Sequence, residues 1–277
     1  MLRFAAPIAF AATLVAAPLW AQKVDEGKID ALFDALGMPQ IIEIMREEGL
    51  SYGDTLAVDM LPGGPSEEWN MAVSAIYDAQ VMQTEVRGAF GGAIEGADID
   101  ALLSFFTSEQ GERIVGLEVS ARLALLDDAI EEASRENAVL AMADKTPRYR
   151  MIQEFVAAND LVEANVVGSL NSSYAFYIGL IDGGAMPTGI TPDIALQDVW
   201  AQEPQVRSDT IEWLYSFLLM AYQPLSDAEL EAYIAFSQTD AGQDLTNALF
   251  LAFNGMFDDI SRALGLASSR FMVIQEL

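Results

Sequence analysis

The sequence contains no histidine and no cysteine. Without these side chains the chain cannot use Ser-His-Asp or Cys-His catalysis, thiol redox chemistry, disulfide bonds or the usual zinc sites. Basic residues are also scarce: 14 Lys and Arg stand against 42 Asp and Glu, and the formal net charge is −28. We therefore expect no nucleic acid or anionic lipid among the partners, whereas cations and basic protein faces suit such a surface.

Phosphate-binding loops and calcium loops are absent as well. The sequence has no G-x-G-x-x-G motif, no G-x-x-x-x-G-K motif and no D-x-D-x-D-G loop. Asp182-Gly183-Gly184 is interpreted as a turn. We predict no cofactor, no nucleotide and no metal ligands, although so acidic a chain leaves a structural cation-binding role open as an alternative.

The first residues have the three parts of a secretory signal. Arg3 supplies a basic start, residues 4–17 form an apolar run, and a stretch containing Pro18 ends at Ala21. The run is shorter than the about 20 apolar residues of a spanning helix, so we expect cleavage rather than an uncleaved anchor. Residues 1–21 are predicted to be a signal peptide that directs an exported, periplasmic protein. No later stretch is long enough for a membrane span.

One stretch of the sequence occurs twice. Residues 98–111 (DIDALLSFFTSEQG) and 229–242 (ELEAYIAFSQTDAG) each combine an acidic start, an apolar run around a Phe and a final Gly. A long amphipathic segment follows each copy, so each is predicted to form a short helix, a tight turn and a long helix. The longest single helix is expected from Glu112 to about Ala143, because only Gly116 interrupts its helix-forming residues.

The same spacing relates further residues of the two regions. Aligned pairs include Trp69 with Trp200, Phe105 with Phe236, Gly111 with Gly242, and Asp127-Asp128 with Asp258-Asp259. This order predicts an all-α, tandem duplicated helical bundle with two similar halves of about five helices each. The first helical repeat is placed at residues 22–146 and the second at residues 147–277. Coincidence between two amphipathic helical regions is the competing explanation.

The repeated stretch resembles a bacterial family known as domain of unknown function 2059. Its hallmark is an acidic-apolar helix ending in an aromatic residue, a short Ser-Pro-x-Gly turn and a long helix. The matching segments are Leu225 to Leu245 and Ile99 to Ile114, in which Glu109 and Asp240 stand where the family has the turn proline. The resemblance implies an all-helical exported protein and carries no catalytic residues over.

The two Asp pairs are the sharpest candidates for chemistry. On a helical wheel Asp128 and Asp259 lie beside small residues of the predicted buried face, at equivalent positions of the two halves. Two half-buried acids can form a proton-transfer pair or a cation site, so Asp128 and Asp259 are the candidate catalytic residues. The alternative is that each carboxylate bonds a neighbouring helix end, an Arg or a Trp N–H.

The absence of catalytic motifs favours a non-enzymatic function. We expect an exported envelope interaction or ligand-binding module whose partner is an envelope protein or a small ligand. Aromatic residues at helical spacing can line a ligand groove or fill a core; they are Trp69, Trp200, Trp213, Tyr215 and Phe217. The alternatives are a cation-binding structural protein and a carboxylate-dependent hydrolase of an envelope substrate, with Asp128 and Asp259 about 5 to 9.5 Å apart in one cleft.

Overall fold

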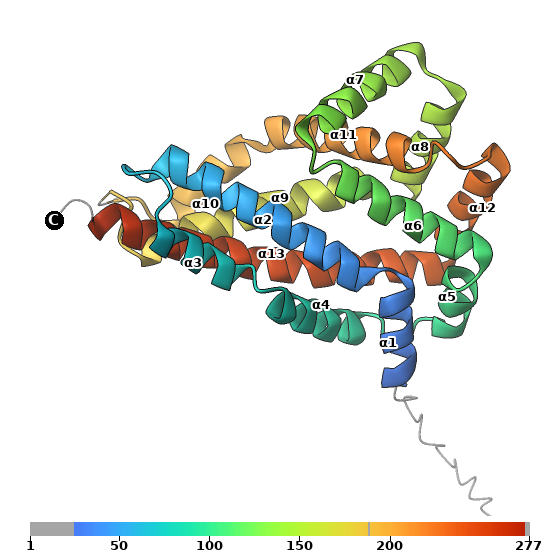
Figure 1. Ribbon diagram of the computed structural model, residues 1–277, viewed down its shortest axis with the longest axis horizontal. Coiled ribbons are helices and arrows are strands. Elements are labelled where there is room, and N and C mark those ends of the chain that lie inside the picture. Colours follow the sequence, from blue (N-terminus) through green and yellow to red (C-terminus); the bar gives the residue numbers. More distant parts are fainter. Residues whose placement is uncertain (1–24, 188, 275–277) are drawn as a thin grey trace, which may run out of the picture.

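A computed structural model describes residues 25–187 and 189–274, and within these ranges the chain forms helices and no strand (Figure 1). The first helices are α1 (Glu26–Ala35), α2 (Met38–Met60), α3 (Glu67–Ile76), α4 (Ala79–Ala93), α5 (Ile99–Phe106), α6 (Glu109–Ala124) and α7 (Asp128–Asp144). They are followed by α8 (Pro147–Ala158), α9 (Leu161–Asp182), α10 (Pro192–Ala201), α11 (Glu203–Ala221), α12 (Asp227–Ser237) and α13 (Asp240–Ile274).

The all-α prediction is therefore confirmed. None of the described helices is both long and apolar enough to cross a membrane. The signal peptide expected at residues 1–21 lies outside the described residues.

The two copies of the repeated stretch fold alike, as α5–α6 and α12–α13. A hydroxyl caps the second helix of each copy: Ser108 Oγ accepts from Gly111 N at 3.1 Å, and Thr239 Oγ1 accepts from Gly242 N at 3.2 Å. Both glycines are needed for the tight turn. A Cβ at Gly111 would lie 2.1 Å from the Phe105 carbonyl oxygen. At Gly242 it would lie 2.5 Å from that of Phe236.

The single long helix expected from Glu112 to about Ala143 is wrong, because α6 ends at Ala124 and α7 begins at Asp128. Asp127 explains the break: its carboxylate accepts hydrogen bonds from Ala129 N at 2.9 Å and Ile130 N at 3.4 Å. These N–H groups open a new helix and would otherwise lack partners. In the second copy α13 continues to Ile274 without such a break.

The second helices of the two copies, α6 and α13, pack on helices outside their own copy. Helix α13 packs on α9 and also on α3, α4 and α5, whereas α6 packs on α11 (Figure 1). One buried apolar cluster consequently joins residues of α1 to α5 to residues 241–267 of α13. A second cluster joins residues of α6 and α7 to α8, α11 and α12. Helix α13 therefore completes the core of the amino-terminal helices, and α6 contributes to the core around α8, α11 and α12.

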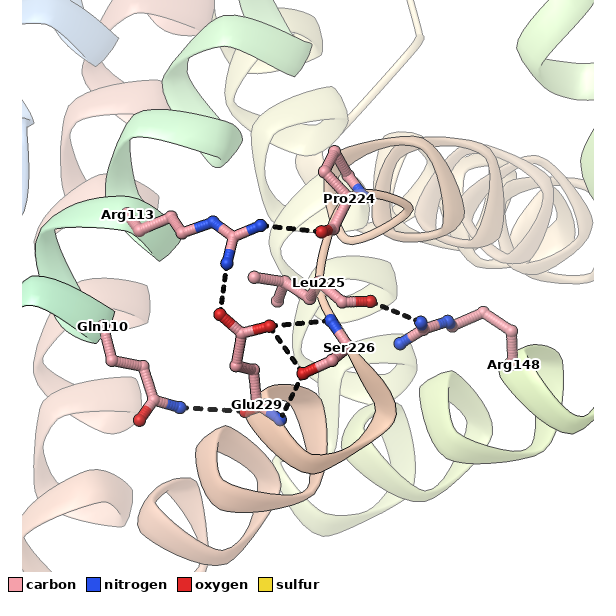
Figure 2. Close-up of polar contacts among 7 residues, drawn as sticks. All are labelled: Gln110, Arg113, Arg148, Pro224, Leu225, Ser226 and Glu229. Atoms are coloured by element: carbon pink, nitrogen blue, oxygen red, sulfur yellow. Dashed lines mark hydrogen bonds and ion pairs between the residues drawn. The ribbon is translucent and has the colours of Figure 1, made fainter.

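Polar contacts from α6 and α8 fix the start of α12. Figure 2 shows Arg113 and Arg148 reaching the chain before α12 from opposite sides in this view. Arg113 Nη2 donates to Pro224 O at 2.7 Å, and Arg148 Nη2 donates to Leu225 O at 2.6 Å. Arg113 also pairs with the Glu229 carboxylate, which accepts from Ser226 N at 2.8 Å in a capping box. Gln110 adds a third contact from outside the turn, since its Nε2 donates to Glu229 O at 2.9 Å.

Candidate functional site

The structure separates the two candidate catalytic residues. Asp128 is exposed in the first turn of α7, which packs on α11 and α8. Asp259 is exposed in the middle of α13, on the side that faces Glu85 of α4. Neither carboxylate belongs to the residues that line the two cavities described below. The geometry thus gives them no common cleft.

The other member of each Asp pair has a structural partner. Asp127 caps α7, and Asp258 Oδ1 accepts a hydrogen bond from Ser172 Oγ at 3.1 Å. Partial burial raises the pKa of Asp258, while the Ser172 hydroxyl lowers it and the charge of Asp259 adds to the rise. Within the described residues, no group of three or more acidic side chains is arranged to hold a metal ion.

A cavity of about 550 Å³ lies among helices from the amino-terminal and the carboxy-terminal parts of the chain. Its wall comes from the end of α1 and from α2, α6, α9, α11 and α13. A volume of roughly 300–1,000 Å³ is typical of sites for small organic ligands. A second cavity, of about 410 Å³, lies between α7 and α11. Its Arg148 pairs with Asp227 through Nη2 at 3.1 Å and leaves Nη1 buried without a described partner. We take the first cavity as the candidate site because it has the larger volume of the two and an aromatic wall.

Aromatic side chains form much of the wall of the first cavity. Trp213 and Phe217 lie one turn apart on α11 and stack, with ring centroids 5.4 Å apart. Phe250, Phe253 and Phe257 of α13 line the same cavity. All five rings are only half-buried, so part of each apolar surface is left for something else to cover. The other aromatic candidates lie elsewhere: Trp69 and Tyr215 are buried in the core, and Trp200 is exposed.

Glu118 of α6 is the acidic group in this wall. Its Oε1 accepts hydrogen bonds from Tyr222 Oη at 2.5 Å and from Tyr233 Oη at 3.3 Å. Burial raises the pKa of Glu118, and the two tyrosine hydroxyls offset part of the rise. Burial, followed by the neighbouring Glu118 charge, raises the pKa of both Tyr222 and Tyr233 well above the ordinary range, so these hydroxyls stay protonated donors.

The basic side chain in the wall is already engaged. Arg122 lies one turn beyond Glu118 and makes a bidentate contact with Glu48, at 3.0 Å from Nε and 2.7 Å from Nη2. Its guanidinium also lies over the Trp213 ring, 5.6 Å from the centroid. None of the described Lys and Arg side chains forms an ion pair with Glu118. Glu118 is therefore a carboxyl group in a mainly apolar cavity without a countercharge.

Amides and hydroxyls complete the wall. Asn165 and Asn254 face the cavity from α9 and α13, together with Thr246 and Ser172. Gly168 makes room for one of these amides, since a Cβ there would lie 2.6 Å from Asn254 Oδ1. An apolar wall with a few polar groups can orient a ligand that has an apolar body and one polar end.

Sequence reasoning missed Glu118, although the sequence carries a signal for it. Gly111, Ile114 and Ala121 mark the buried stripe of α6 at helical spacing, and Glu118 falls on the same stripe. The spacing that pairs Gly111 with Gly242 also pairs Glu118 with the apolar Leu249, which lines the same cavity. Glu118 is an acid on an apolar stripe, and the aligned residue of the other copy is apolar. A search for motifs overlooks such a difference at a single position.

Comparison of the chain with protein-family models, with curated proteins and with solved structures found no match. The resemblance of residues 99–114 and 225–245 to domain of unknown function 2059 therefore stays a prediction, and the site has to be interpreted from its own geometry.

Proposed function

We propose that this protein is a non-enzymatic binding protein that holds a largely apolar small molecule in the cavity between α2, α6, α9, α11 and α13. The observation that carries the proposal is the cavity of about 550 Å³ itself, with its half-buried aromatic wall. Binding would cover apolar surface worth about 25 cal/mol per Å², which is the largest favourable term available to such a ligand.

The proposal extends to how the cavity arose. We propose that the chain is a duplication, with α1–α6 corresponding to α8–α13. This is supported by matching packing, since α1 lies on α5 as α8 lies on α12, and α2 lies on α3 as α9 lies on α10. The contact of α6 with α11 likewise corresponds to that of α13 with α4. The cavity is then a site between two related halves, a common place for ligands.

We further propose that the protein acts after export, in the periplasm. Support comes from residues 1–21, which combine Arg3, an apolar run and a small-residue end at Ala21. Cell fractionation and amino-terminal sequencing of the mature protein test this part. Retention in the cytoplasm with Met1 still present would contradict it and would leave the cavity proposal standing.

A neutral fluorescent dye such as N-phenyl-1-naphthylamine tests the cavity proposal. The purified protein is expected to enhance the dye emission with saturable binding. Ser169→Trp places a large ring at a position that lines the cavity, and it should weaken binding at least about tenfold. Val167→Trp is the matched control, because Val167 is exposed on the same helix outside the cavity wall. Equal binding by both variants, or none by the parent protein, would refute the proposal.

A further inference from the structure

We propose that the ligand carries a positively charged nitrogen, as an alkylamine or alkylammonium compound does, and that Glu118 binds this charge. The inference rests on the proposed function of the cavity and adds the chemical class of the ligand.

One oxygen of the Glu118 carboxylate accepts no hydrogen bond from the described residues. Both tyrosine hydroxyls donate to the same oxygen, Oε1, and no described residue donates to Oε2. Oε2 is also not one of the fully buried atoms without a partner. It is therefore open to the cavity and able to accept a hydrogen bond from an ammonium group, with the short, strong geometry of a charge-assisted contact.

The cavity wall around Glu118 contains aromatic rings. Aromatic faces attract cations through the negative potential of their rings, and indole is the best of them. Phe217 on α11 and Phe253 on α13 supply such rings in the cavity wall. Trp213 already holds the Arg122 guanidinium over its ring at 5.6 Å, so a cation lies against an aromatic face of this wall in the present structure.

The charged groups around the cavity favour a cationic ligand over an anionic one. A fatty acid would need a free basic group, and Arg122 already makes its bidentate contact with Glu48. The carboxylate of the fatty acid would also be repelled by Glu118 and by the field of a chain with a formal net charge of −28. That field instead attracts cationic ligands and raises their local concentration.

Three ligands with one dodecyl chain test the inference: dodecyltrimethylammonium, dodecanol and dodecanoate, each displacing the neutral dye below its micelle-forming concentration. The cation is expected to bind at least about tenfold more tightly than the alcohol, because the Glu118 charge and the aromatic rings attract it, and the carboxylate should bind most weakly. Dodecylamine, which also has N–H donors for Oε2, should bind at least as tightly as the quaternary ion.

Glu118→Gln is expected to remove the preference for the cation, measured as the ratio of the affinities for dodecyltrimethylammonium and dodecanol, because Gln keeps the size of the side chain and lacks its charge. Glu112→Gln is the matched control: it removes one acid from the exposed face of the same helix and should keep the preference. Dye binding with equal displacement by all three ligands, or with tighter dodecanoate binding, would overturn the inference and leave the proposed function intact. Failure of the dye to bind would overturn both.

Discussion

The Phe105 ring stacks on the Phe236 ring, with centroids 3.8 Å apart and planes inclined by 6°. The two residues occupy the same position in the two copies of the repeated stretch. Phe106 meets Phe236 edge-on at 5.7 Å, and Tyr233 lies parallel to Phe105 at 5.9 Å. The two copies of the repeated stretch therefore contact each other through their own central aromatic residues.

Truncating either ring should destabilise the protein. Phe105→Ala and Phe236→Ala are each expected to lower the free energy of unfolding by about 2–3 kcal/mol, at or below the low end for a buried Phe because both rings are half-buried. In urea denaturation, the loss in the free energy of unfolding of the double variant should be about 0.5–1.5 kcal/mol smaller than the sum of the losses of the two single variants. Strict additivity would show that the stacked pair contributes nothing beyond its separate burial.

The turn glycines should tolerate no side chain. Gly111→Ala and Gly242→Ala force a Cβ against backbone carbonyls and are expected to destabilise by about 1–3 kcal/mol, as overpacking does. Gly116→Ala and Gly255→Ala are controls on the same two helices, where an added Cβ meets no atom within 4 Å. These controls should gain up to about 1 kcal/mol from helix propensity. Thermal unfolding of the four variants measures the contrast, and equal shifts would contradict it.

The local elements could be predicted from the sequence because their causes are local. An acidic start, an apolar run and a Gly specify a short helix, a turn and a second helix, and both copies follow this pattern. The break at Asp127 was missed because the same Asp-Asp pair is compatible with a helix interior and with a helix cap. Tertiary packing decides between the two, as the uninterrupted α13 at Asp258 shows.

The environment of a side chain could not be read from its position in the repeat. Trp69 is fully buried, and its Nε1 donates to Gly53 O at 2.9 Å, whereas the aligned Trp200 is 56% exposed. The cavity escaped prediction for the same reason. Its wall joins α2 and α6 to α9, α11 and α13, and no periodicity within one helix reports on such a junction.

The stability of Glu118→Gln should depend on pH in a defined direction. Burial raises the pKa of Glu118 above its ordinary value of 4.5, so the folded state binds more protons at this site than the unfolded state. Its contribution is favourable below that value and is lost as the pH rises through the raised pKa. Gln cannot ionise and keeps an oxygen acceptor for Tyr222.

We therefore expect Glu118→Gln to match the parent protein at about pH 5 and to be more stable at about pH 8, in urea titrations at both values. Glu112→Gln controls for the loss of an acidic side chain elsewhere on α6. A stability difference that is the same at both pH values would show that the carboxyl group is not perturbed on folding.

Neutralising the two aligned acids should have opposite effects on stability. Asp259 lies beside Glu85, whose pKa is raised by partial burial and further by contact with Asp259. Asp259→Asn removes this like-charge contact and is expected to stabilise by about 0.5 kcal/mol or less near neutral pH. Asp128 lies in the first turn of α7, where the helix dipole favours a negative charge, so Asp128→Asn should cost about 0.3–1 kcal/mol. Denaturation of each variant at low salt measures the sign of its change in the free energy of unfolding. Both changes should become smaller at high salt because the side chains are exposed. A shared catalytic role would instead appear as a loss of turnover in both variants with no such contrast in stability.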